Sequence, residues 1–388
     1  MRVLVVAEFY PRAADPVLGV WAHRQALAAR DAGADVRVIV LHRPIAPAAQ
    51  ARSLAAWRTA IAQPRRAELD GLDVRYVRYL SPPRGRSYQR WGAYAAPALR
   101  RAMRSLRGEF PFELVHAHYA SPAGDAVLRA GIETPLVVSE HGGDLFHTIG
   151  LPGGEALVRS VFERAAMVLP NSDAVDARVR ALGARRTRVV PLGTDVPATE
   201  PRRPDQPTIV TVAHLIDRKR HEDVLRAIWM LRDRRPDLRY RIVGDGPARR
   251  RLQELTRALG LEDRVTFTGE LPHDEAVREG QAATMVAMPS TDEAFGVAYV
   301  EAMAAGTPAI GARGEPGPEH LAARTLGMRL VPPGEPEALA REIEQLLEPR
   351  WGARVRADAR ATVAATFSWE ACGRETVAAY REVLDGAR

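Results

Sequence analysis

Short apolar segments alternate with helical patterns in two successive series, and this alternation restricts the possible folds more than any other feature of the sequence. The first series of expected strands lies at residues 3–7, 36–41, 74–79, 114–117, 136–138, 167–169 and 188–190. The second lies at residues 208–213, 240–243, 265–267, 285–288, 308–311 and 329–331. Apolar strands separated by helices form parallel sheets covered by helices on both faces. We therefore expect an α/β protein with two Rossmann-like, doubly wound domains facing a central cleft.

The boundary between the two series is a proline-rich run, with prolines at positions 197, 201, 204 and 207. Such a run forms neither a helix nor a central strand, so residues 197–207 are the expected linker. A length of 388 residues also favours two domains over one. We expect domains at 1–196 and 208–368. The last helical stretch, 369–388, has no following strand and is expected to pack back on the N-terminal domain.

Several classes of protein are excluded by composition. Cys372 is the single cysteine, which excludes a disulfide framework and cysteine-based zinc or iron–sulfur sites. The longest apolar runs are far too short to span a membrane. The first residues enter a strand pattern directly, without a signal-peptide cleavage region, so we expect a cytoplasmic protein.

Positive charge is concentrated in the first half of the chain. Residues 1–200 hold 27 arginines against 19 acidic side chains, whereas the remainder holds 28 basic and 29 acidic residues. The first half is therefore expected to meet something anionic. Nucleic acid would fit this charge but not the nearly neutral second half, so we expect no nucleic-acid partner.

The segment 75–107 contains nine arginines and no acidic residue. Aromatic side chains are interleaved with them, namely Tyr76, Tyr79, Tyr88, Trp91 and Tyr94. One interpretation is a solvated helix packed on the sheet, in which Pro97 introduces a kink or starts a new helix. The other is a basic, aromatic surface for anionic lipid or a lipid-phosphate acceptor, which would place the protein peripherally on the inner face of the membrane.

The loop after the expected strand 208–213 is strongly basic. It contains His214, Arg218 and Lys219, and Lys219 is the only lysine among 55 basic residues. Basic side chains beside a helix N-terminus suit a phosphate group. The alternative is a solvated basic loop.

Two glutamates follow the expected strand 285–288. Glu293 lies in the loop, and Glu301 lies about one turn inside the helix that begins near Gly296. The first N–H groups of that helix could hold an anion, while the glutamates could accept hydrogen bonds from hydroxyl groups. A diphosphate flanked by hydroxyl-bearing groups describes a nucleotide sugar. The alternative is that both glutamates are ordinary surface charges.

The segment Glu-Ala-Phe-Gly-Val-Ala-Tyr-Val-Glu at 293–301 resembles the E-x7-E signature of family 4 retaining glycosyltransferases, which have the GT-B fold. Other matches follow in order along nearly all of the chain. They are the first loop ending at Gly19, His116-Ala-His118, His141-Gly-Gly-Asp144, Val190-Pro-Leu-Gly-Thr-Asp195, His214-Leu-Ile-Asp-Arg-Lys219, Val243-Gly-Asp-Gly-Pro247, Val265-Thr-Phe-Thr-Gly269 and Phe367-Ser-Trp369.

This resemblance assigns the C-terminal domain to the nucleotide-sugar donor. Lys219 matches the family's diphosphate-binding lysine, whereas His214 departs from the usual arginine, so Arg218 could take its place. Glu293 would face the transferred sugar, and Glu301 would bind the ribose hydroxyls.

Backbone groups complete the expected donor site. Phe295, Gly296 and Val297 would offer N–H groups to sugar or phosphate. The strip around Leu271 would read the base, and Gly19 would let the N-terminal backbone approach the diphosphate.

The N-terminal domain is expected to bind the acceptor. His118 resembles a histidine that reaches the donor sugar, although a core histidine is the alternative, and with Lys219 and Glu293 it completes the expected catalytic set. His141 and Asp144 lie where the acceptor pocket is expected.

The resemblance implies transfer that retains the anomeric configuration, from a nucleotide sugar to a hydroxyl of a lipid-linked, glycan or small-molecule acceptor. A UDP-sugar is the first expectation and a GDP-sugar the second. No cofactor or metal is expected, since the sequence has no Asp-x-Asp motif. The alternative is a nucleotide-sugar epimerase, or another enzyme of this fold that does not transfer.

Overall fold

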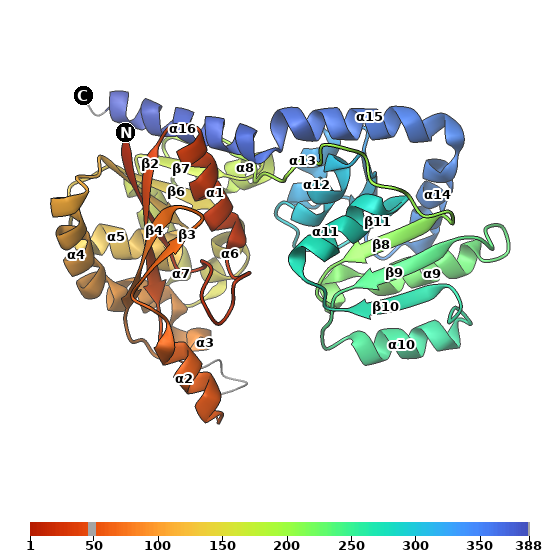
Figure 1. Cartoon of the computed structure of the whole chain (residues 1–388), viewed down its shortest axis with the longest axis horizontal. Helices are drawn as coiled ribbons and strands as arrows, with labels where there is room; N and C mark the ends of the chain where they lie inside the picture. Colours follow the sequence, from red (N-terminus) through yellow and green to blue (C-terminus); the bar gives the residue numbers. More distant parts are fainter. Residues whose placement is uncertain (46–51, 387–388) are drawn as a thin grey trace. The chain divides into compact units, whose positions relative to one another are not determined.

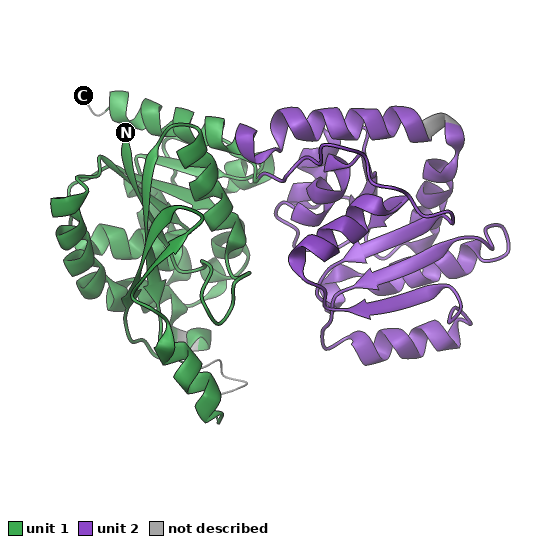
Figure 2. Cartoon of the chain, viewed as in Figure 1, with its two compact units in different colours: residues 1–192, 372–388 green, residues 193–371 purple. Residues whose placement is uncertain are grey.

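The computed structural model describes residues 1–45 and 52–386, and they form two compact units (Figures 1 and 2). Unit 1 comprises Met1–Leu192 and Cys372–Arg388, and unit 2 comprises Gly193–Ala371. The change of unit therefore comes four residues before the expected boundary at 196, and the proline-rich run 197–207 belongs to unit 2. The C-terminal residues return to unit 1 from Cys372.

Unit 1 is built on a seven-stranded sheet with the order β3-β4-β2-β1-β5-β6-β7. Its strands are β1 (Arg2–Ala7), β2 (Asp35–His42), β3 (Arg66–Leu69), β4 (Leu72–Arg78), β5 (Leu114–His118), β6 (Leu136–Glu140) and β7 (Met167–Pro170). All pairs are parallel except β3 with β4. The order reverses between β1 and β5, because β1 pairs with both β2 and β5.

The helices of unit 1 cover both faces of this sheet. They are α1 (Val20–Asp31), α2 (Leu54–Ala62), α3 (Arg84–Ser87), α4 (Trp91–Glu109), α5 (Asp125–Ala130), α6 (Gly143–Phe146), α7 (Gly154–Arg164), α8 (Asp173–Ala181) and most of α16 (Trp369–Asp385). Side chains alternate along β5: Val115 and Ala117 join the core with α4, α5 and α7, whereas His116 faces the other way and hydrogen-bonds Tyr380 of α16 at 2.7 Å.

Helix α16 packs closely on α1. A Cβ atom on Gly373 would lie 2.2 Å from the carbonyl oxygen of Ala28, so only glycine permits this approach. Gln25 of α1 also donates a hydrogen bond to the hydroxyl of Thr376 at 3.1 Å. The chain terminus is thus part of the N-terminal core.

Unit 2 is a six-stranded, fully parallel sheet with the order β10-β9-β8-β11-β12-β13. Its strands are β8 (Thr208–Val212), β9 (Arg239–Val243), β10 (Val265–Gly269), β11 (Met285–Ala287), β12 (Ala309–Ala312) and β13 (Met328–Val331). Its helices are α9 (His221–Leu231), α10 (Arg249–Ala258), α11 (His273–Ala282), α12 (Val297–Ala304), α13 (Pro316–Ala322), α14 (Pro336–Leu347) and α15 (Pro349–Thr366). The strand order reverses between β8 and β11. In sheets of this kind ligands bind beyond the carboxyl ends of the strands at that switch point.

One local prediction is wrong, and one of the two alternatives for Pro97 is excluded. Residues 188–190 form no strand. They run beside β7, and Val190 donates to the carbonyl of Pro170 at 2.8 Å, but Pro170 has no N–H to return the bond. Pro97 starts no new helix, because α4 continues through it. The carbonyl left without a donor is that of Ala93, which is exposed and can bind water.

The interpretation of 75–107 as an aromatic surface also needs correction. Tyr76, Tyr79, Tyr88 and Trp91 are all buried, and only Tyr94 is substantially exposed, at 41%. The apolar stripe of α4 faces the sheet, with Leu99 and Met103 fully buried. The surface of this segment therefore consists of exposed arginines with two separate large hydrophobic side chains, Tyr94 and Leu80, the latter 71% exposed.

Candidate functional site

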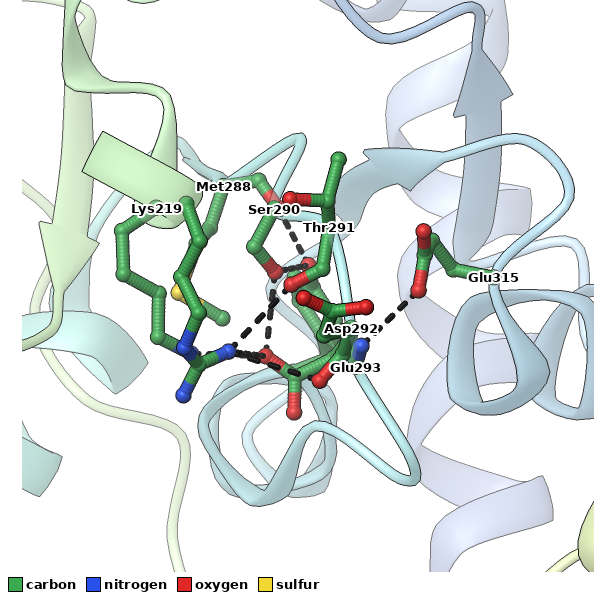
Figure 3. Close-up of polar contacts among 9 residues, drawn as sticks. Lys219, Met288, Ser290, Thr291, Asp292, Glu293 and Glu315 are labelled. Carbon is green, nitrogen blue, oxygen red and sulfur yellow. Dashed lines mark hydrogen bonds and ion pairs between the residues drawn. The ribbon is translucent and has the colours of Figure 1, made fainter. Parts of the chain in front are cut away.

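The two loops at the switch point of unit 2 hold the expected catalytic lysine and glutamate side by side. Lys219 ends a short 3₁₀ turn after β8, and Glu293 lies in the loop after β11. The Lys219 Nζ and Glu293 Oε2 atoms are 2.6 Å apart, and both side chains are largely buried (Figure 3). Residues 74 positions apart in the sequence thus meet because β8 and β11 are neighbours in the sheet.

Arg218 supplies a second positive charge to this pair. Its Nη1 lies 4.0 Å from Glu293 Oε2 and also donates to the carbonyl of Thr291 at 3.3 Å. The Thr291 N–H in turn donates to the Arg218 carbonyl at 2.9 Å. Two cations therefore face one carboxylate, and the excess positive charge suits an anionic ligand. His214 is exposed in the same loop.

Glu293 is held by groups that sequence reasoning missed. Its N–H donates to Glu315 Oε2 at 2.8 Å, and its carbonyl accepts from the Gly317 N–H at 2.9 Å. Ser290 donates its hydroxyl to Glu293 Oε2 at 3.0 Å (Figure 3). The only signal for Glu315 and Gly317 in the sequence is the short Gly-Glu-Pro-Gly turn that opens α13.

Gly296 connects the Glu293 loop to α12. Its φ is 82°, and a Cβ atom there would lie 2.3 Å from Cδ2 of Tyr299. Glycine is therefore required by both backbone conformation and space. The first N–H groups of α12, which have no partners within the helix, follow directly at Val297. Phe295 is buried, so its side chain anchors the loop.

Glu301 belongs to a second polar group, formed by α12 and α11. Its Oε1 lies 3.7 Å from Nε2 of His273, a residue that sequence reasoning missed. Burial raises the pKa of Glu301, nearby His273 lowers it and Asp195 raises it further. Leu271 is half-buried two residues before His273. The predicted ribose and base contacts therefore lie on neighbouring elements of one unit.

Glycines also shape the loops beside β8. Gly244 and Gly246 have φ values of 134° and 158°, and Cβ atoms on them would lie 2.1 Å from the Ala213 carbonyl oxygen and 2.5 Å from that of Leu215. Because glycine has no Cβ atom, the two backbones can approach closely here. The Leu215 N–H donates to the Asp245 carbonyl at 2.9 Å and so holds the basic loop against the Val-Gly-Asp-Gly-Pro segment.

The expected histidines of unit 1 form a stacked group. His118 Nδ1 and His141 Nε2 are hydrogen-bonded at 3.0 Å, and their rings are stacked. Burial lowers the pKa of His141 to about 3, and burial with the two neighbouring histidines lowers the pKa of His118 well below its usual value. Both are therefore neutral at pH 7. Within the described residues, His118 Nε2 has no hydrogen-bond partner.

Asp144 lines a pocket of unit 1, but its carboxylate is mostly taken up by backbone groups. It is 1% exposed, and its carboxylate accepts from the N–H groups of Ala120 at 2.6 Å and Ser121 at 3.3 Å. Burial raises the pKa of both Asp144 and its neighbour Glu140. Burial of both carboxyls in one place therefore favours the protonated form of this pair more than exposure to water would. Asp144 thus organises the loop after β5.

Gly19 is explained by packing within unit 1. Its φ is 64°, and a Cβ atom would lie 2.2 Å from the carbonyl oxygen of Phe9. Glycine is required at this position before any ligand is considered. In residues 1–45 and 52–386, no group of three or more His, Cys, Asp or Glu side chains is arranged to hold a metal ion.

Comparison with known proteins relates both units to glycosyltransferases. The family model of group 1 glycosyl transferases matches residues 195–363, and the model of glycosyltransferase family 4 matches residues 18–197. A relative is the GDP-mannose-dependent alpha-(1-6)-phosphatidylinositol monomannoside mannosyltransferase of Mycolicibacterium smegmatis. It is 28% identical over 320 residues, which cover 75% of this chain and 81% of that protein.

Solved structures share the fold over the whole chain. Sucrose-phosphate synthase of Thermosynechococcus elongatus has a TM-score of 0.78 at 21% identity, with 100% of both chains covered. HepE of Anabaena, solved in complex with UDP and glucose, has a TM-score of 0.69 at 20% identity, covering 98% of this chain and 100% of that one. The two sheets are those of the GT-B fold, and the chain belongs to the group 1, family 4 glycosyltransferases.

Proposed function

We propose that the chain is a retaining glycosyltransferase that moves a sugar from a nucleotide sugar to a hydroxyl of a lipid-linked, glycan or small-molecule acceptor. The group of Lys219, Arg218 and Glu293 at the switch point of unit 2 carries this proposal. It combines excess positive charge for a diphosphate with a carboxylate for sugar hydroxyls, and the nearby helix α12 carries Glu301 for the ribose.

The proposed donor is a UDP-sugar first and a GDP-sugar second. HepE, which shares the fold, was solved with UDP and glucose, and the mycobacterial relative is GDP-mannose-dependent. The strip at Leu271 offers backbone groups to either base. The two donors share the diphosphate and ribose, so Lys219 and Glu301 would serve both.

In the proposed reaction, the acceptor oxygen bonds to the anomeric carbon on the face from which the diphosphate leaves. The bond from that carbon to the diphosphate oxygen breaks, and the leaving phosphate takes the acceptor proton. Lys219 and Arg218 stabilise the negative charge that develops on the diphosphate. His118 is proposed to act on the donor sugar, and its Nε2 is buried without a hydrogen-bond partner among the described residues. The proposal assigns no role to a metal.

The function is tested by a thermal-shift panel of nucleotide sugars, followed by transfer assays. We expect a UDP-sugar to raise the melting temperature most, with about 2.7 kcal/mol of stabilisation at 100-fold above Kd. Proton NMR of the product should show the donor's anomeric configuration, and EDTA should leave the rate unchanged. An inverted product would contradict retention. Conversion of the donor sugar without any acceptor would favour the epimerase alternative.

Unit 1 also exposes a helix suited to an anionic membrane. None of the side chains of α2 is buried, and Leu54 and Ile61 are 77% and 51% exposed. The helix is anchored at its C-terminal end, where Arg78 donates to the Ile61 carbonyl at 2.7 Å. Residues 36–67 contain six arginines and no acidic residue. Exposed apolar side chains in an arginine-rich segment without acidic residues are typical of surfaces that insert between anionic lipid headgroups.

We therefore propose that the membrane contact expected for residues 75–107 is centred on α2. No helix among the described residues is long and apolar enough to span a bilayer, so the proposed contact is peripheral. The arginines of 75–107 would add charge, while α2 would supply the apolar anchor that the buried aromatics cannot.

Flotation with vesicles tests this contact. The chain should float with phosphatidylglycerol-containing vesicles, less so at high salt, and not with pure phosphatidylcholine. Replacing Leu54 and Ile61 together by glutamate should lower binding at least about tenfold, since each buried side chain contributes about 1.5–3 kcal/mol. The matched control is Leu326→Glu, which changes a 38% exposed leucine of unit 2. Equal flotation of the double variant and the control would contradict the proposed membrane contact.

A further inference from the structure

A pocket of about 650 Å³ opens within unit 1, at the point where its strand order reverses. The loops after β1 and β5 contribute Phe9 and Tyr119, and the segment that contains α3 contributes Arg84 and Tyr88. Thr148 and Leu151 also line the pocket. Pockets of a few hundred cubic ångströms with aromatic walls and a few polar groups typically bind small molecules.

Tyr119 adopts a backbone conformation that side chains rarely occupy. Its φ is 73° and its ψ is 150°, a region populated almost entirely by glycine. The surrounding backbone holds it there: the Tyr119 N–H donates to the Ser139 carbonyl at 2.9 Å, and its carbonyl accepts from Gly124 at 3.1 Å. Such conformations concentrate at ligand sites.

The strained backbone brings the Tyr119 ring to the pocket wall. The ring meets Phe9 edge-to-face, with centroids 5.8 Å apart, and meets His141 at 5.3 Å. A Cβ atom on Gly143 would lie 2.9 Å from Cε1 of Tyr119, so glycine leaves the ring its space. The result is an aromatic corner in which the Tyr119 and Phe9 rings, edge-to-face, can pack against the apolar surface of a ring-shaped ligand.

Arg84 provides the charge at this wall. Its guanidinium lies over the rings of Tyr88 at 4.2 Å and Phe9 at 5.1 Å. Arg84 acts electrostatically on buried Glu8, which accepts a hydrogen bond from the Tyr88 hydroxyl at 2.8 Å. Arg12 and Arg43 also act electrostatically on Glu8, so one buried carboxyl interacts with three guanidinium groups.

The opposite wall does not cancel that excess. Asp144 lines the pocket, but it is bonded to backbone N–H groups, and burial raises the pKa of both Asp144 and Glu140. His147 contributes an imidazole to the same wall. A ligand that combines a ring with an anionic substituent complements both the aromatic surface and the positive charge.

We propose that this pocket binds the acceptor, with its ring against Tyr119 and Phe9 and an anionic group, phosphate or carboxylate, at Arg84. This inference rests on the proposed function, because it names the acceptor class of the same transferase. The anionic ring could be a free sugar or cyclitol phosphate, or the headgroup of a lipid.

Ligand-observed NMR with defined probes tests the proposal. Glucose 6-phosphate and glucuronate should bind the parent at least tenfold more tightly than glucose. Phosphatidylinositol in phosphatidylcholine vesicles is the lipid probe. Vesicles with the same fraction of phosphatidylglycerol are its control, because the contact proposed for α2 would bind any anionic vesicle. Preference for the soluble phosphate identifies a free acceptor, and preference for phosphatidylinositol over phosphatidylglycerol vesicles identifies a lipid headgroup. The proposal is overturned if neither the charged sugars nor the phosphatidylinositol vesicles bind, or if glucose and glucose 6-phosphate bind equally.

Three variants separate the ring from the charge. Arg84→Gln should abolish the preference for the charged probes, whereas Arg104→Gln, an exposed arginine of α4 with the same charge change, should preserve it. Tyr119→Gly should fold, since glycine suits this backbone, yet lose binding of all probes. Tyr119→Phe should retain binding. Full binding by Tyr119→Gly, or full discrimination by Arg84→Gln, would refute the assignment.

The donor panel distinguishes this inference from the proposed function. A normal nucleotide-sugar shift with no binding of ring phosphates would end the inference and leave the transferase proposal standing. Binding of ring phosphates that depends on Arg84, with no nucleotide-sugar shift, would end the transferase proposal.

Discussion

Lys219→Ala is expected to lower kcat for sugar transfer by about 10²–10³-fold, the usual effect of removing a group that stabilises charge in the transition state. The ammonium lies 2.6 Å from Glu293 and is 12% exposed, so water cannot fully replace it. Arg218, 4.0 Å from the same carboxylate, would supply only part of the lost charge. Single-turnover and steady-state transfer assays with a saturating donor measure the effect.

Two further variants test whether the site requires the compact ammonium group itself and whether the effect is specific to this position. Lys219→Arg keeps the charge but replaces a compact ammonium with a planar guanidinium, and should also lose most activity. Arg226→Ala removes an exposed cation from α9 of the same unit and should behave as the parent does. Melting temperatures of all three should stay close to the parent's. A Lys219→Ala rate within about threefold of the parent would mean that the diphosphate is bound elsewhere.

The two sheets could be predicted because their central strands are continuous apolar runs. Val3, Val5 and Val6 are fully buried, as are Val286 and Ala287 to within 1%. Strand β3 escaped prediction because its four residues alternate between exposed and half-buried at a sheet edge, where arginine and glutamate are tolerated. Residues 188–190 were predicted as a strand because apolar composition alone does not show that Pro170 cannot return a hydrogen bond.

The site could be predicted in its residue types but not in its pairings. Lys219 and Glu293 belong to loops of neighbouring strands, so the sheet order places them together, but their direct ion pair depends on side-chain geometry. Glu315 binds a backbone N–H from a distant turn, and His273 approaches Glu301 from the adjacent helix α11. Neither contact has a fixed sequence spacing that could have indicated it.

The pocket of unit 1 could likewise be predicted only in part from the sequence. His141 and Asp144 were both predicted to bind the acceptor. Asp144 lines the pocket, but its carboxylate is bonded to backbone N–H groups, and His141 packs against the Tyr119 ring. The residue that the pocket presents is Tyr119, whose side-chain direction follows from a backbone conformation normally reserved for glycine. No composition or spacing rule predicts a tyrosine there.

Glu301→Ala is expected to abolish most of the thermal stabilisation by a nucleotide sugar. Each hydrogen bond to a charged group contributes about 1.5–3 kcal/mol, so losing both ribose contacts would weaken binding at least about 100-fold. At a donor concentration 100-fold above the parent's Kd, the expected stabilisation of about 2.7 kcal/mol would then nearly vanish. The matched control is Glu275→Ala, an exposed acid of α11, which should respond as the parent does.

The pH dependence of donor affinity gives a second readout at the same residue. Burial raises the pKa of Glu301, so its carboxyl takes up a proton at a higher pH than an exposed glutamate. Since the carboxylate accepts stronger hydrogen bonds than the acid, donor affinity should fall as pH is lowered through that raised pKa. The folded chain also binds this proton more tightly than the unfolded chain, so the contribution of Glu301 to the free energy of unfolding falls as pH rises. Glu301→Gln should lose both dependences, and a parent-like pH profile in that variant would exclude Glu301 as the ribose ligand.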